Sequence, residues 1–93
     1  MMETAENFIK YLFNKSRENG FLKIRKYPHL KTYTIKITPK LYKKLFNLLI
    51  FEKEVLTIEN NKILFFYQKR ISEIVKLNDY QYKVTIWKNI NQK

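Results

Sequence analysis

The second half of the chain restricts the possible folds more than any other feature. Between residues 54 and 88, short runs rich in β-branched and aromatic residues are separated by two-residue polar breaks, Asn60-Asn61, Gln68-Lys69 and Asn78-Asp79. Breaks this short are typical of hairpins, because only neighbouring antiparallel strands can be joined by two residues. The pattern predicts an antiparallel meander over about 54–88, with strands at about 54–59, 62–67, 70–77 and 80–88.

These runs differ in how clearly they define a strand. The last run alternates Tyr80, Tyr82, Val84 and Ile86 with Gln81, Lys83, Thr85 and Trp87, as a strand with one buried face requires. In the run 70–77, apolar residues also fit helical spacing. A strand is the preferred interpretation of 70–77, and a helix is the alternative.

The first half of the chain predicts two helices on either side of a hairpin. Thr4 can cap a helix over about 5–19, and Gly20 suits the position just after its end. Thr38-Pro39 predicts the start of a second helix over about 39–50, since proline fits the first helical position. The positions expected on the inward side at helical spacing are Ala5, Phe8, Ile9, Leu12, Phe13 and Ser16 in the first helix and Leu41, Tyr42, Leu45, Phe46, Leu48 and Leu49 in the second.

Between the helices, alternating side chains predict strands at about 21–26 and 32–37, joined by a turn at 27–30. Leu22 and Ile24 would face inward in the first strand, and Tyr33, Ile35 and Ile37 in the second. The outer face of this hairpin would be polar and cationic.

Together, these elements predict an α+β fold of order α-β-β-α-β-β-β-β, with two helices packed on one face of a mainly antiparallel sheet. A chain of 93 residues leaves no room for a second independent core. We therefore expect residues 1–93 to form a single domain, with a loose tail at 89–93.

The distribution of charge along the sequence indicates a negatively charged partner. The formal net charge is +11, and residues 21–51 carry eight lysines and arginines without a single acid. Such a segment cannot neutralise its own cations, so we expect one contiguous positive surface that attracts a polyanion, nucleic acid above all. The alternative is that the surplus of lysine only keeps the protein in solution.

Two stretches of this segment are candidate binding surfaces. The start of the second helix combines the Thr38 hydroxyl and free backbone N–H groups with three lysines, which resembles the arrangement that holds phosphate. A solvated helix face is the alternative there. The outer face of the hairpin mixes Phe21 with cations, so that bases could stack while phosphates pair with the charges.

Trp87, with Lys83 and Lys88, would extend the hairpin face if the last strand lies beside it. For Trp87 alone, partial burial or a dimer contact is the preferred interpretation, and stacking is the alternative. The expected nucleic-acid-binding residues are Lys23, Arg25, Lys26, Lys36, Thr38, Lys40, Lys43, Lys44, Lys83 and Trp87. No zinc-finger spacing, basic zipper or aromatic-glycine motif is present, so we expect phosphate contact without base readout.

The residues needed for catalysis are scarce. The chain has one histidine and no cysteine, and no acid is followed two residues later by a lysine, the pair common in metal-dependent nucleases. We therefore expect no enzymatic activity, no cofactor and no metal site.

The order of a helix, Asn19-Gly20, two basic strands and a second helix resembles in outline the start of HicA-type ribonuclease toxins. In that family a glycine-serine run precedes a histidine, and this run is absent before His29. The resemblance therefore does not carry catalysis over to His29.

The predicted function is that of a non-enzymatic nucleic-acid-binding protein, with a homodimer as one possible form. The alternative is an inhibitor or adaptor that directs the same surface at an acidic protein patch, as a viral antagonist of a host nucleoprotein would. Binding to anionic lipid through the second helix is weaker, because its apolar side is expected to face the sheet.

The sequence also predicts where the protein resides. No apolar stretch approaches the roughly 20 residues that span a bilayer, and the start of the chain lacks the pattern of a secretory signal. We therefore expect no membrane insertion and a cytoplasmic location. The abundance of Lys, Asn and Ile indicates AT-rich coding and suggests a virus, phage or low-GC prokaryote as the source.

Overall fold

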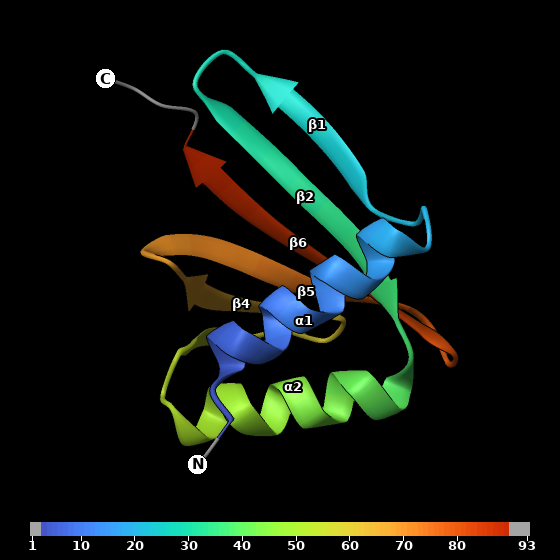
Figure 1. The fold of residues 1–93 in the computed structure, drawn as a ribbon. Helices are drawn as coiled ribbons and strands as arrows, with labels where there is room; N and C mark the ends of the chain where they lie inside the picture. Colours follow the sequence, from blue (N-terminus) through green and yellow to red (C-terminus); the bar gives the residue numbers. More distant parts are fainter. Residues whose placement is uncertain (1–2, 90–93) are drawn as a thin grey trace.

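A computed structural model describes residues 3–89, and in this part of the chain two helices pack against a six-stranded antiparallel sheet (Figure 1). The predicted α+β class and the order α-β-β-α-β-β-β-β are confirmed. The elements are α1 (Ala5–Glu18), β1 (Lys23–Tyr27), β2 (Leu30–Ile37), α2 (Pro39–Phe51), β3 (Val55–Ile58), β4 (Lys62–Tyr67), β5 (Arg70–Asn78) and β6 (Gln81–Asn89).

The strands are arranged in the order β1-β2-β6-β5-β4-β3. The last strand thus joins the meander β3–β6 to the N-terminal hairpin, because β6 pairs with the whole of β2, from Leu30↔Asn89 to Ile37↔Tyr82. Residues 70–77 belong to a strand, as preferred from the sequence, since β5 pairs with β4 on one side and β6 on the other.

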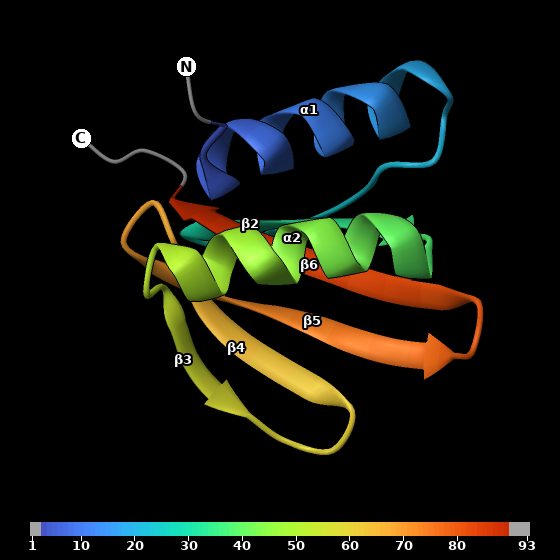
Figure 2. The ribbon, with the colours of Figure 1, turned by 90° about the horizontal axis from the view of Figure 1, so that it is seen from below.

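The core lies between the helices and one face of the sheet, and Figures 1 and 2 show both helices on that face. The apolar sides predicted for the two helices face this core. Alternate strand residues complete the core because successive side chains of a strand point to opposite faces. The buried residues include Phe8, Ile9 and Leu12 from α1, Leu45 and Leu49 from α2, and Ile35, Phe65, Ile74 and Val84 from the strands.

The first strand departs from its prediction. It begins at Lys23 instead of residue 21, and all five of its residues are exposed, including Ile24 at 48%. The reason is its position at the edge of the sheet, where it has a strand neighbour on one side only. Leu22 still rests against the core, although it precedes the strand.

The turn and the tail also differ from expectation. Tyr27 pairs with Leu30, so only Pro28 and His29 remain between the strands, where the sequence predicted a turn over 27–30. Asn89 belongs to β6 instead of the predicted loose tail at 89–93. Residues 90–93 of that tail lie outside the described residues.

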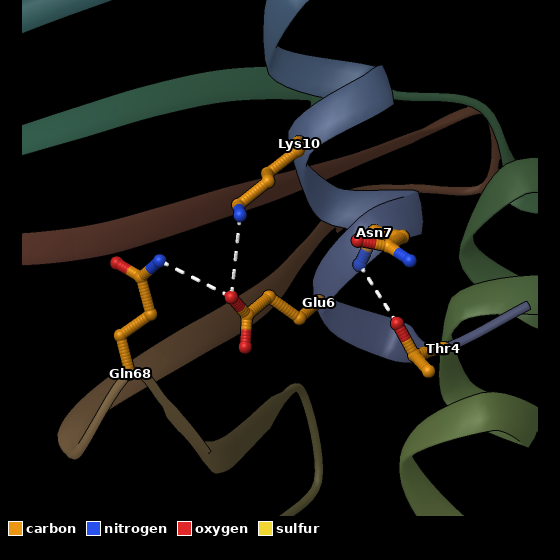
Figure 3. Close-up of polar contacts among 5 residues, drawn as sticks. All are labelled: Thr4, Glu6, Asn7, Lys10 and Gln68. Atoms are coloured by element: carbon orange, nitrogen blue, oxygen red, sulfur yellow. Dashed lines mark hydrogen bonds and ion pairs between the residues drawn. The ribbon is translucent and has the colours of Figure 1, made fainter.

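The start of α1 is attached to two distant parts of the chain, the β4–β5 turn and the end of α2, and Figure 3 shows the first of these contacts. The Thr4 hydroxyl caps the helix as predicted and accepts the N–H of Asn7 at 3.1 Å. Glu6 carries an ion pair to Lys10 at 3.3 Å and accepts a hydrogen bond from Gln68, in the β4–β5 turn, at 3.4 Å. At the end of α2, the carboxylate of Glu52 accepts the N–H of Ala5 at 2.8 Å. The contacts of Glu6 with Gln68 and of Ala5 with Glu52 thus connect the start of α1 to the β4–β5 turn and to the end of α2.

An aromatic stack attaches α2 to the start of β6. The rings of Tyr42 and Tyr82 lie nearly parallel, with centroids 3.9 Å apart. Burial raises the pKa of the Tyr42 hydroxyl, and the nearby Tyr82 adds to this rise.

Both helices end in a Schellman motif, but the left-handed residue just after the helix differs between them. In α1 the N–H of Phe21 reaches the carbonyl of Ser16 at 2.8 Å, and in α2 the N–H of Glu54 reaches the carbonyl of Leu49 at 3.0 Å. Each is the six-to-one bond of a Schellman motif, which needs a left-handed residue just after the helix. That residue is Gly20 in α1, with φ of 78°, and Lys53 in α2, with φ of 60°.

This difference yields a matched pair of stability predictions. Lys53→Gly should raise the free energy of unfolding by about 0.5–1 kcal/mol, because glycine adopts positive φ without a Cβ clash. Gly20→Ala should lower it by about 1–2 kcal/mol, although the new methyl group would meet no atom within 4 Å. Urea unfolding followed by circular dichroism measures both changes, and equal stability of Gly20→Ala and the parent would contradict the assignment of the two helix ends.

Candidate nucleic-acid interface

One face of the sheet carries no helix within residues 3–89, and strand register decides which side chains stand on it (Figure 2). Lys23 of β1 pairs with Thr34 of β2, and Thr34 pairs with Thr85 of β6. Side chains two positions along each strand share this face. We define the open-face patch as the set of its cationic and aromatic residues on these three strands, namely Lys23, Arg25, Tyr27, Lys36, Lys83 and Trp87.

Threonines fill the spaces between the charges. Thr32 lies between its cross-strand partners Arg25 and Trp87, and it is only 7% exposed because both neighbours are much larger. The hydroxyls of Thr34 and Thr85 are hydrogen-bonded to each other at 3.0 Å. The predicted inward side of Tyr33, Ile35 and Ile37 leaves Thr32 and Thr34 on the outward face, and the register confirms that side while Thr32 is buried there.

Within residues 3–89, the cations of the open-face patch form no ion pair with an acidic side chain. The ion pairs found within residues 3–89 involve Lys10, Lys44 and Lys76, and none of these belongs to the patch. Lys36 lies directly opposite Lys83, an arrangement in which like charges repel. Among the described strand residues on this face, Glu73 is the one carboxylate, opposite Thr85. The patch therefore has a positive potential that an anion would relieve.

The candidate phosphate-binding surface at the start of α2 lies on the opposite side of the sheet from the open-face patch. Lys40, Lys43 and Lys44 are exposed on α2, and Thr38 is occupied as its cap, accepting the N–H of Leu41 at 3.3 Å. Lys44 is partly neutralised, since its ammonium lies 2.9 Å from a carboxylate oxygen of Glu3. It also lies 4.7 Å from the ring centroid of Phe8.

The expectation of one contiguous basic surface from residues 21–51 is therefore wrong. Helix α2 packs on the face of the sheet opposite the open-face patch, so its lysines lie on the other side of the sheet from those on the outer face of the hairpin (Figures 1 and 2). Lys23, Arg25, Lys36, Lys83 and Trp87 are brought together. Lys40, Lys43 and Lys44 form a separate stripe.

Lys26 belongs to neither group. It pairs with Lys31, which in turn pairs with Lys88, on the face that carries the helices. The Lys88 ammonium lies 5.5 Å from the ring centroid of Tyr33. No local pattern in the sequence marks this row as a cluster, because only the long-range pairing of β2 with β6 brings Lys31 and Lys88 together.

Beside the open-face patch, the same face becomes apolar. On β4 and β5, Phe66 is 43% exposed and its cross-strand partner Ile71 is 51% exposed. Leu64 and Val75 stand on the same face at half-buried positions. The sequence contained no signal for this area, because the apolar residues on both faces of β4 and β5 concealed which face the helices cover.

Three further observations concern metal ligands, the histidine and membrane spans within residues 3–89. No three His, Asp or Glu side chains gather there in a group that could hold a metal ion. His29 is exposed in the β1–β2 turn. Of the helices in residues 3–89, neither is long and apolar enough to cross a bilayer.

Comparisons with protein families, with curated proteins and with solved structures find no match for this chain.

The repulsion between Lys36 and Lys83 can be tested by stability. Lys36→Glu turns the opposed lysines into an opposite-charge pair and should raise the free energy of unfolding by about 0.2–1 kcal/mol at low salt. The gain should fade in molar salt, where screening is strong. Arg25→Glu is the matched control, because the same charge change faces Thr32. Equal effects of the two variants would contradict the proposed repulsion.

Proposed function

We propose that this chain binds single-stranded DNA or RNA on the open face of its sheet, without catalysing a reaction. The observation that carries the proposal is the register of β1, β2 and β6, which sets Trp87 and Tyr27 on the same face as Lys23, Arg25, Lys36 and Lys83. Aromatic rings among cations are what a single strand needs, because bases stack on the rings while phosphates pair with the charges.

The spacing of the cations supports contact with several phosphates at once. Side chains two positions apart on one strand are separated by about 7 Å, and neighbouring strands by about 5 Å. Lys23 and Arg25 are related in the first way, and Lys36 and Lys83 in the second. The cations of the patch are therefore spaced so that several phosphates, and not only one anion, can be bound at once.

A single strand fits this face better than a duplex. In a duplex the bases are stacked on one another and their faces cannot reach Trp87 or Tyr27, whereas an unpaired strand exposes them. Stacking depends little on which base is present, so we expect weak sequence preference.

A second candidate function is binding to an acidic protein. The exposed Phe66 and Ile71 favour it, because they continue the open-face patch with an apolar area of the kind found at the centre of protein interfaces. A second copy of this chain could use the same area. Association that persists after nuclease treatment would favour this candidate.

The proposal predicts which variants lose affinity for a labelled oligothymidylate in fluorescence anisotropy. Arg25→Glu/Lys36→Glu should weaken binding by at least tenfold, because both cations lie on the open face. Trp87→Ala should weaken it by roughly fivefold or more through lost stacking. If about four phosphates are contacted, log K should fall against log salt with a slope of about −3.

The matched control is Lys40→Glu/Lys43→Glu, which changes the net charge equally but on the α2 stripe. It should alter affinity by less than threefold. A larger loss in this control than in the open-face variant would move the site to α2, and a flat salt response would reject nucleic-acid binding altogether.

A further inference from the structure

A cavity of about 730 Å³ opens where the end of α1 meets the start of β1 and the adjoining ends of β2 and β6. Figure 1 shows the end of α1 above this corner of the sheet. The volume lies within the range of about 300–1,000 Å³ that is usual for small-molecule sites. The cavity is continuous with the open-face patch, because Lys23, Lys36 and Lys83 line both.

The cavity concentrates positive charge. Its lining includes Lys15 from α1, Lys23 from β1, Lys36 from β2 and Lys83 from β6, and it contains no aspartate or glutamate. None of these four lysines takes part in the ion pairs found within the described residues. Four lysines from four elements therefore line one space without an acidic residue among its lining, a composition that favours an anion.

The remaining lining is apolar and aromatic. Leu12, Ile35 and Ile37 form a buried floor that belongs to the core. Tyr11 and Phe21 stand at the cavity with 53% and 73% of their surface exposed. The hydrogen bond from the backbone N–H of Phe21 to the carbonyl of Ser16 fixes the main chain there, and the exposed ring can stack on a planar group.

The backbone at the cavity also has free hydrogen-bonding capacity. The pairing of β1 with β2 ends at Lys23↔Thr34, so residues 35–37 of β2 have no strand partner on that side. Exposed strand edges present unpaired N–H and C=O groups. Such groups can bind the polar edge of a base.

We propose that this cavity binds a nucleotide, with its phosphate among the four lysines and its base against Phe21, Tyr11 and the apolar floor. The nucleotide has two possible sources, a free mononucleotide or the phosphorylated end of a strand lying on the open face. The site goes beyond the proposed function, because its floor and Lys15 lie apart from the open-face patch and would hold a free nucleotide without a bound strand.

The test is a titration followed by amide NMR shifts, with adenosine 5′-monophosphate, adenosine and inorganic phosphate as probes. The monophosphate should bind at least tenfold more tightly than either adenosine or phosphate, with the largest shifts at Lys15, Phe21 and Lys36. Lys15→Glu should weaken it roughly tenfold. Arg17→Glu, the same charge reversal on the same helix outside the cavity lining, should change it less than twofold.

A second arm separates the two sources, using oligothymidylates with a phosphate or a hydroxyl at the 5′ or 3′ end. Preference for a phosphorylated end identifies the strand end as the source, and monophosphate binding without such a preference identifies the free nucleotide. The proposal is overturned if the monophosphate binds no better than adenosine, or if Arg17→Glu weakens it as much as Lys15→Glu does.

Trp87→Ala distinguishes this site from the proposed function, because Trp87 is not part of the cavity lining. It should weaken strand binding and leave the monophosphate affinity unchanged. Binding of the monophosphate without any binding of strands would reject the proposed function and support the cavity site.

Discussion

The pairing of β6 with β2 is the interaction on which the rest of the structure depends. It joins the N-terminal hairpin to the C-terminal meander in one sheet, from Leu30↔Asn89 to Ile37↔Tyr82. A shift of this register by one residue would turn every side chain of β6 to the opposite face. Val84 and Ile86 would then leave the core, and Lys83 and Trp87 would leave the face on which Arg25 and Lys36 stand. The same pairing therefore completes the core and assembles the candidate interface.

Local patterns were sufficient to predict most of the fold. The two-residue breaks predicted the meander, and Thr38-Pro39 predicted the start of α2, because hairpins and helix caps depend on residues close together in the sequence. The candidate site depends on tertiary arrangement. Lys40 and Lys23 both belong to the acid-free segment, and nothing near them in the sequence shows that α2 and the hairpin present them on opposite sides. The exposure of Ile24 likewise follows from the strand order, which leaves β1 at an edge.

Like charges are directly opposed at two places in the sheet. Lys36 faces Lys83 on the open face, and Lys31 faces both Lys26 and Lys88 on the other. Directly opposed like charges destabilise a sheet, and acids at some of these positions would remove the repulsion. A bound anionic ligand would supply the missing negative charge. The open-face patch and the cavity share Lys23, Lys36 and Lys83, so one group of lysines could serve a bound strand and a nucleotide phosphate.

The fluorescence of Trp87 tests strand binding on the open face most directly, because this is the only tryptophan of the chain. An unlabelled oligothymidylate is titrated at low ionic strength while tryptophan emission is recorded. If bases stack on the open face, the emission should be quenched to a saturating level and should recover when salt is added. Strand binding that leaves the emission unchanged, or no binding at all, would contradict the proposed role of this face.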